Sequence, residues 1–158
     1  MKCLVACSFF ILMFFAGHGQ NSTNKIVVTE TNASFTVATI TSLLAGQSIA
    51  SSFNFNVISS TKGYHVYVKS ANSTGSTSTP IPPSKLGVQI TSRTGTAATY
   101  NSSKVNLTTV DQALVTAGTK TSTSTSATFT CTLFLDPLDF TYSPGVYNFV
   151  VTFTMTQP

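Results

Sequence analysis

The sequence contains no tryptophan and very little charge, since lysine, arginine, aspartate and glutamate together make up 8% of its 158 residues. Eight basic residues outnumber four acidic ones, which gives a formal net charge of +4. The basic residues are scattered along the chain, whereas a nucleic-acid-binding face gathers lysine and arginine together. We therefore expect no nucleic-acid partner.

Groups that transfer protons, attack carbonyls or ligate metals are also scarce. The chain has two histidines, three cysteines and four carboxylates, and no cluster has the spacing of a zinc site. The closest acid pair, Asp136 and Asp139, supplies too few oxygens for a calcium shell and suits a turn. His65 falls on the solvent face of an expected strand, and Cys131 falls on a core face. The sequence thus predicts no enzyme, no cofactor and no metal site.

The N-terminus has the layout of a secretory signal peptide. A short positive start precedes an apolar run over 3–15, and small residues follow at 16–19. The apolar run is too short for a membrane-spanning helix, which needs roughly 18 residues or more. We expect cleavage after Gly19, leaving 158 − 19 = 139 residues as one domain over 20–158, without a transmembrane anchor. This predicts export to the periplasm, the cell surface or the extracellular space.

What the sequence does contain is apolar residues at every second position, which is typical of strands with one buried face. Between the strands lie turn-forming residues, and no stretch of ten residues has helical periodicity. We predict an all-β fold, an antiparallel Ig-like β-sandwich of about eight or nine strands. The expected strands are 25–31, 33–40, 52–58, 64–70, 85–92, 104–110 with 112–115, 126–135 and 145–156.

Three further predictions concern the connections between strands and the position of the last strand in its sheet. Gly63 lies between two alternating segments, so 52–70 is expected to be a β-hairpin. The proline-ending, apolar-poor segment 70–84 is expected to be a long exposed loop. The C-terminal strand alternates large apolar residues up to the end of the chain, and we expect it to be central in its sheet. The apolar residues of that strand are Tyr147, Phe149, Val151, Phe153 and Met155.

The first strand-like segments of the expected domain are low in charge and follow a polar tail. Such a segment could leave its own domain and complete the sheet of another copy by β-strand addition. The residues that would make this exchange are Ile26, Val28, Phe35 and Val37. The alternative, which is the simpler interpretation of the pattern, is that 25–40 pairs within its own sandwich.

The C-terminal segment YSPGVYNFVVTFTMTQP resembles the closing strand of spore-coat-U-like pilin domains and the end of WxL-type surface domains. FNFNVISSTKGYHVYVKSA and PIPPSKLGVQI are similar to the hairpin and next strand of WxL-like domains. Two features depart from these families: the chain has no tryptophan, with Tyr64 near the expected place, and the domain over 20–158 cannot form an internal disulfide. The resemblance implies a β-sandwich at a bacterial envelope.

These observations predict a secreted or cell-surface protein with a structural or adhesive role. A narrower version of this prediction is a pilus-like or self-assembling subunit. Its partners would be copies of itself or another envelope subunit. The alternative is a monomeric module that binds a glycan or a host ligand through exposed aromatic rings, with Tyr100 and Tyr142 as candidates.

Overall fold

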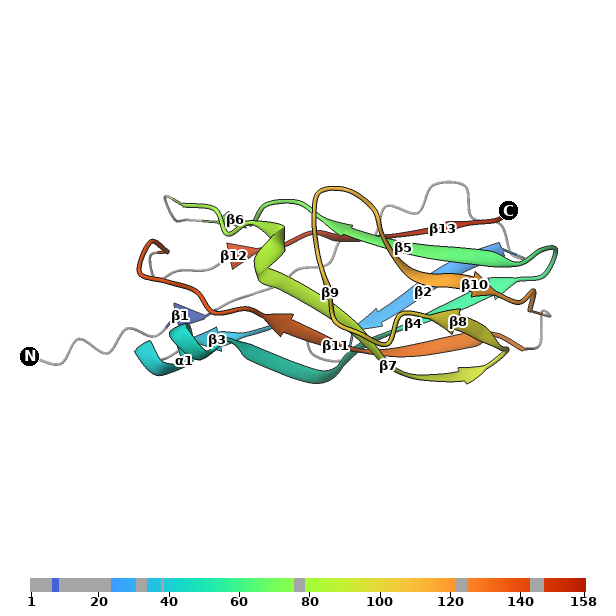
Figure 1. The fold of residues 1–158 in the computed structure, drawn as a ribbon, viewed down its shortest axis with the longest axis horizontal. Coiled ribbons are helices and arrows are strands. Elements are labelled where there is room, and N and C mark those ends of the chain that lie inside the picture. Colours follow the sequence, from blue (N-terminus) through green and yellow to red (C-terminus); the bar gives the residue numbers. More distant parts are fainter. Residues whose placement is uncertain are drawn as a thin grey trace, which may run out of the picture.

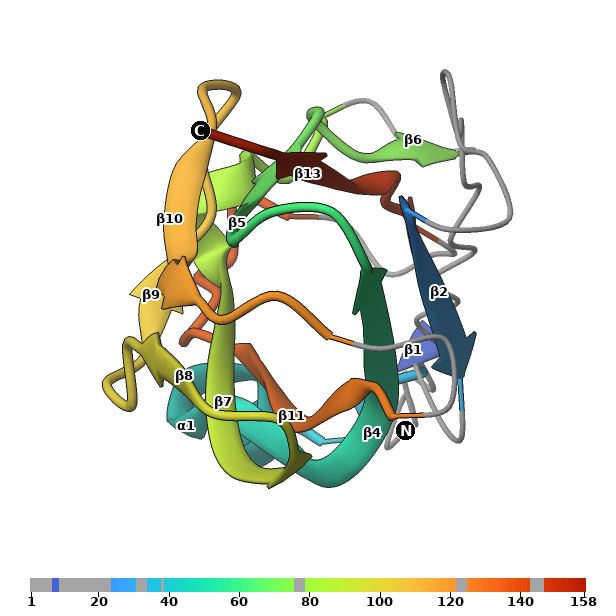
Figure 2. The same ribbon diagram turned by 90° about the vertical axis from the view of Figure 1, so that its right-hand side faces the viewer.

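The computed structural model describes residues 7–8, 24–30, 34–37, 39–75, 79–121, 125–142 and 147–158. Two antiparallel sheets pack face to face with the core between them (Figures 1 and 2). The five-stranded sheet has the order β2 (Asn24–Glu30), β4 (Gln47–Ser59), β11 (Ala127–Leu135), β7 (Leu86–Gly95), β9 (Val105–Asn106). The four-stranded sheet has the order β13 (Val151–Thr156), β5 (Tyr64–Ser70), β10 (Gln112–Gly118), β8 (Ala98–Tyr100). The prediction of an all-β antiparallel sandwich is confirmed.

Smaller elements complete the described part of the chain. Two short antiparallel pairs join β1 (Cys7–Ser8) to β3 (Thr36–Val37) and β12 (Tyr147–Asn148) to β6 (Thr74–Gly75). One helix, α1 (Ile40–Ala45), and one 3-10 turn, η1 (Pro83–Lys85), also form. β1 falls within the segment that we expect to be removed as a signal peptide.

The alternating residues form the core as the sequence predicts. Phe55 of β4 stacks on Phe129 of β11 in the same sheet, with ring centroids 4.7 Å apart. Phe55 also reaches Phe153 of the opposite sheet, at 5.6 Å, and Tyr100 meets Phe129 edge-on at 5.9 Å. Cys131 is fully buried, as expected. Aromatic rings therefore join the two sheets at both sides of the sandwich.

The expected hairpin over 52–70 is wrong. β4 and β5 lie in different sheets and face each other across the core, so residues 60–63 cross from one sheet to the other. Within this connection, the Ser59 hydroxyl donates to the carbonyl oxygen of Lys62 at 2.8 Å. Alternation indicates only that each strand buries one face, and two such strands can be neighbours in one sheet or opposite each other in two.

The C-terminal strand is not central. Within the described part of the chain, β13 pairs only with β5 and forms an edge of the four-stranded sheet, whereas β11, between β4 and β7, is a central strand. The predicted inward face is nonetheless correct, because Tyr147, Phe149, Val151 and Phe153 are all buried. A strand can bury a continuous apolar face at a sheet edge when the opposite sheet covers it.

The segment 70–84 is not a fully exposed loop. Ser73 and Ile81 are buried and close the segment on itself, since the Ser73 amide donates to the Ile81 carbonyl at 2.9 Å. In return, the Ile81 amide donates to the Ser73 hydroxyl at 2.6 Å. Pro83 is also buried. Ile81 and Pro83 therefore anchor a segment in which most other residues are small and polar.

The expected strand over 33–40 is shorter than predicted. β3 covers only Thr36–Val37, and α1 begins at Ile40. A reciprocal capping box starts the helix: the Ser42 amide donates to the Thr39 hydroxyl and the Thr39 amide donates to the Ser42 hydroxyl, both at 3.1 Å. Such a box satisfies two amides that the first helical turn leaves unpaired.

Candidate functional site

The residues with catalytic or metal-binding chemistry lie apart from one another. Among the described residues, no three histidine, cysteine or acidic side chains gather to hold a metal ion. Asp136 pairs with Lys104, while Asp139 accepts the Thr141 amide at 2.9 Å in a turn. Hydrogen bonds from the side chain and the backbone of Thr141 lower the pKa of the Asp139 carboxyl. These acids therefore stabilise local structure.

The sequence also singled out His65 and Cys131, and the structure places the first outside the sandwich and the second in its core. His65 lies on the outer face of β5 with its ring 6.4 Å from that of Tyr67. Burial raises the pKa of the Cys131 thiol well above its ordinary value. Because the thiolate is the reactive form, this cysteine is expected to be inert.

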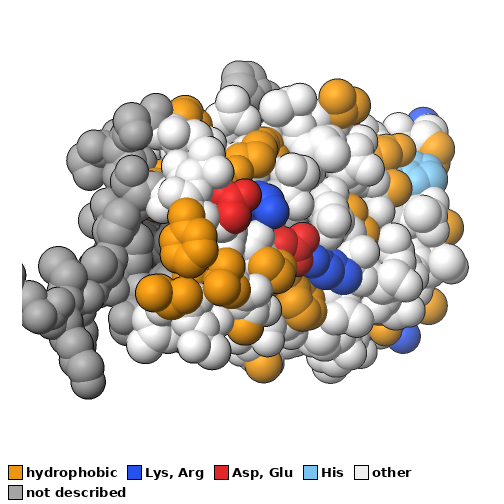
Figure 3. Space-filling model, turned by 60° about the vertical axis from the view of Figure 1, so that its left-hand side comes forward, with side chains coloured by type: hydrophobic (Ala, Val, Ile, Leu, Met, Phe, Trp, Pro, Cys, Tyr) orange, Lys and Arg blue, Asp and Glu red, His pale blue; other side chains and the backbone are white. Residues whose placement is uncertain are grey.

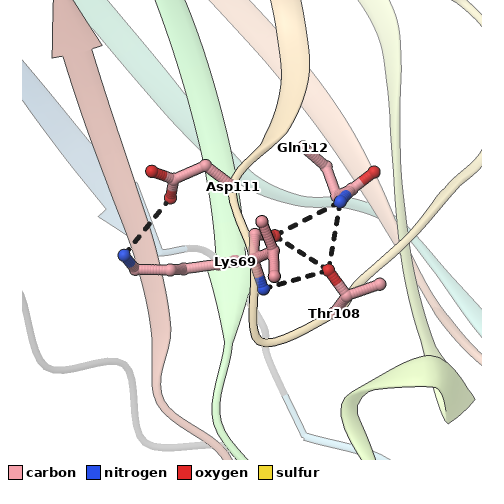
Figure 4. A network of polar contacts seen from close by, with 5 residues as sticks. Lys69, Thr108, Asp111 and Gln112 are labelled. Carbon is pink, nitrogen blue, oxygen red and sulfur yellow. Dashed lines mark hydrogen bonds and ion pairs between the residues drawn. The ribbon is translucent and has the colours of Figure 1, made fainter.

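A polar network fixes the connection that leads from β9 in one sheet to β10 in the other (Figure 4). Lys69 of β5 forms an ion pair with Asp111 at 3.4 Å. The Thr108 hydroxyl donates to the Val110 carbonyl at 2.8 Å and accepts from the Gln112 amide group at 3.0 Å. Both charged side chains are about 40% exposed, so the ion pair is screened by solvent and contributes little. The network holds a loop in place.

Tyr64 carries a buried hydroxyl that has no hydrogen-bond partner in the described structure. Its ring lies against Gly118, where an added Cβ would come within 2.1 Å of a ring atom. Burial raises the pKa of Tyr64 to about 12. The phenol therefore contributes its ring to the core while its hydroxyl loses water without compensation.

We predict that Tyr64→Phe stabilises the protein. The substitution keeps the ring and removes an unpaired polar atom, whose burial costs about 1–3 kcal/mol. The urea midpoint should rise, corresponding to a gain of about 1 kcal/mol. Tyr147→Phe is the control, because Tyr147 is equally buried but is a residue that makes an interaction, and it should not gain stability. A lower midpoint for Tyr64→Phe would show that its hydroxyl has a partner.

The proposed exchange residues fall into two separate elements. Ile26 and Val28 lie on β2 and pack partly buried against the core, where β2 pairs with β4 of its own chain from Asn24↔Ser59 to Glu30↔Phe53. Phe35 is buried, just before β3. Val37 pairs with Cys7 through β3, and its side chain lies outside the described residues.

The exposed apolar residue of β2 is one that the sequence reasoning missed. Val27 lies between Ile26 and Val28, faces away from the core and is 44% exposed. Its partner on β4 is Asn56, which belongs to the polar outer face of the sheet. The signal was available in the sequence, because Val27 is an apolar residue at a position where an alternating strand normally has a polar one. The outer face of β2 therefore carries an apolar side chain.

The four edges of the sandwich differ in length. At one side, β8 has three residues and β9 has two. At the other side, β2 has seven and β13 has six, and Figure 2 shows these two edges together. The Gln157 amide joins them by donating to the Asn24 side-chain oxygen at 3.1 Å. Short edges discourage strand addition whereas long, regular ones favour it, so the side formed by β2 and β13 is the candidate site.

A second surface feature is an apolar patch at one end of the molecule, formed by Ile40, Leu44 and Phe140 (Figure 3). Ile40 and Leu44 are one turn apart on α1, and Phe140 is 71% exposed. The amide of Leu138 donates to a carbonyl of α1, that of Leu43, at 3.0 Å. This bond brings the helix and the loop that bears Phe140 together into one surface.

The two aromatic residues that the sequence offered for sugar stacking are not free. Tyr100 and Tyr142 are partly buried and pack against the core, and Tyr100 contacts the ring of Phe129. Phe140 is the large aromatic side chain that the described structure exposes. The core therefore covers part of both side chains.

Among the described residues, no helix has the length and apolar character needed to cross a membrane. No protein-family model matches the chain, and a comparison with curated proteins finds no significant match.

Proposed function

We propose that the protein is an exported structural or adhesive subunit of a cell surface, built as an Ig-like sandwich, that joins other subunits by β-strand addition along β2. The observation that carries this proposal is that β2 lies at the edge of the five-stranded sheet and, among the described residues, pairs with β4 alone. The strand is regular over its whole length, contains no proline and keeps its charges, Lys25 and Glu30, near its ends. These are the features that natural edge strands usually avoid.

Two other features support the same function. A surface of serine, threonine and asparagine with few charges suits a protein outside the cell, and the predicted signal peptide leads there. The C-terminal strand resembles those of envelope domains. Since β2 is already paired with β4, addition of a strand to its outer edge requires no unfolding of the domain, whereas strand exchange would first have to break that pairing.

We expect the purified protein to associate as its concentration rises, and a charge at the middle of β2 to prevent this. Val27→Lys should weaken association about tenfold or more, equivalent to about 1.4 kcal/mol, because a lysine on an edge strand opposes pairing with another edge. Light scattering coupled to size exclusion measures the mass at each concentration. The thermal melt of the variant should match that of the original protein, since Val27 faces solvent.

Val110→Lys is the matched control, because Val110 is 67% exposed on a loop away from β2. It should associate normally. A protein that stays monomeric over the whole concentration range would contradict the proposal and favour the alternative of a monomeric binding module.

A further inference from the structure

We infer that the partner of β2 is β2 of a second copy, paired antiparallel about a two-fold axis that passes through Val27. This inference rests on the proposed function and specifies its interface. It would join two five-stranded sheets into one continuous ten-stranded sheet.

The first argument is the choice of edge. Val27 is a large apolar side chain exposed near the middle of β2, whereas β13 exposes no large apolar side chain. Across a two-fold axis at this position, Val27 of one copy lies opposite Val27 of the other. Directly opposed apolar side chains stabilise an antiparallel pair, and the contact removes both from water.

The second argument is the register. Centring the pair on Val27 places Lys25 opposite Thr29 of the second copy and Ile26 opposite Val28. The inner faces of both strands then lie on the same side, whereas a shift by one residue would turn the core face of one copy toward solvent. Centring the pair on Ile26 or Val28 would place Val27 opposite Lys25 or Thr29 and lose the contact between the two Val27 side chains. Centring it on Lys25 or Glu30 would bring like charges directly opposite each other, which is destabilising.

The third argument is closure. A two-fold contact uses the same surface on both copies and is the commonest symmetry of soluble oligomers. The short edges β8 and β9 at the other side discourage further addition there. The two-fold contact through β2 therefore gives a dimer as the unit from which any larger assembly is built.

Cysteine cross-linking tests the axis directly. In the protein purified after export, Cys131 is the cysteine that we expect to remain, and it is buried. Paired residues of antiparallel strands have Cα atoms about 4.5 or 5.5 Å apart, within the range of about 4.4–6.8 Å that a disulfide spans. Val27→Cys should therefore form a covalent dimer on mild oxidation, visible on a non-reducing gel.

Thr29→Cys is the matched control, because it lies on the same face of the same strand but opposite Lys25 of the second copy. Alone it should remain monomeric on the gel, and mixed with Lys25→Cys it should form a heterodimer. Cross-linking of Thr29→Cys alone, without that of Val27→Cys, would overturn the inferred register.

Association without cross-linking of either variant would overturn the two-fold pairing but leave the proposed function standing. The double variant Val27→Cys/Asn56→Cys then distinguishes the route, since these residues are partners between β2 and β4. A disulfide between chains would indicate strand exchange, and one within the chain would show that β2 stays in its own sheet. Absence of any association would defeat the inference and the proposed function together.

Discussion

Removing residues 147–158 is expected to abolish the cooperative unfolding transition of the protein. The truncation deletes β12 and β13, and with them the buried side chains of Tyr147, Phe149, Val151 and Phe153. Each contributes about 1.5–3 kcal/mol by burial, so their combined loss of about 6–12 kcal/mol is comparable with the whole stability of a typical domain, about 5–15 kcal/mol. It also uncovers apolar residues on the inner face of the five-stranded sheet.

Removing only Gln157 and Pro158 is the control for this truncation. It deletes hydrogen bonds from the Gln157 amide to the side chains of Ser59, at 2.6 Å, and Asn24, but no core residue. We expect a sharp melt with a loss of about 1 kcal/mol. Circular dichroism and a heat scan of both truncations measure the difference, and a sharp, near-native melt of the long truncation would show that the C-terminal strand is dispensable.

The individual strands were predictable because a buried face leaves a period of two in the sequence. The segment 64–70 matches β5, and 126–135 matches β11 to within a residue. Side-chain direction was predictable for the same reason, as the C-terminal strand shows. The period of two identifies which side chains are removed from water, whichever strands then become neighbours.

The arrangement of the strands was not predictable from the same pattern. The alternation of 52–58 and 64–70 is the same whether these strands pair or face each other, and only the fold places them in separate sheets. The edge position of β13 was missed because a fully apolar face does not reveal how many neighbours supply hydrogen bonds. The helix α1 has six residues, too few for a helical period to emerge.

The candidate site was predictable in its segment but not in its residues. Low charge and strand character pointed to the first part of the domain, yet Ile26 and Val28 face the core. Val27 carries the exposed apolar surface. Exposure depends on which face the opposite sheet covers, and both faces of β2 carry apolar residues, so local sequence could not decide between them.

Phe55→Ala is expected to destabilise the protein by about 3–5 kcal/mol, the usual cost of emptying a phenylalanine site in a core. The Phe55 ring is fully buried, stacks on Phe129 and contacts Phe153 of the opposite sheet. Its removal therefore weakens packing within one sheet and between the two. In urea, with a slope of about 1–3 kcal/mol per molar, the midpoint should fall by one molar or more.

Phe140→Ala supplies the matched control, because the same chemical change is made at a phenylalanine that is 71% exposed; its effect should stay within about 0.5 kcal/mol. The double variant Phe55→Ala/Phe129→Ala should lose less than the sum of the single losses, since stacked rings contribute about 0.5–1.5 kcal/mol beyond their area. Equal losses at Phe55 and Phe140 would mean that Phe55 does not lie in the interior. Such a result would contradict the two-sheet packing, because Phe55 of β4 packs on β11 of its own sheet and on β13 of the opposite sheet.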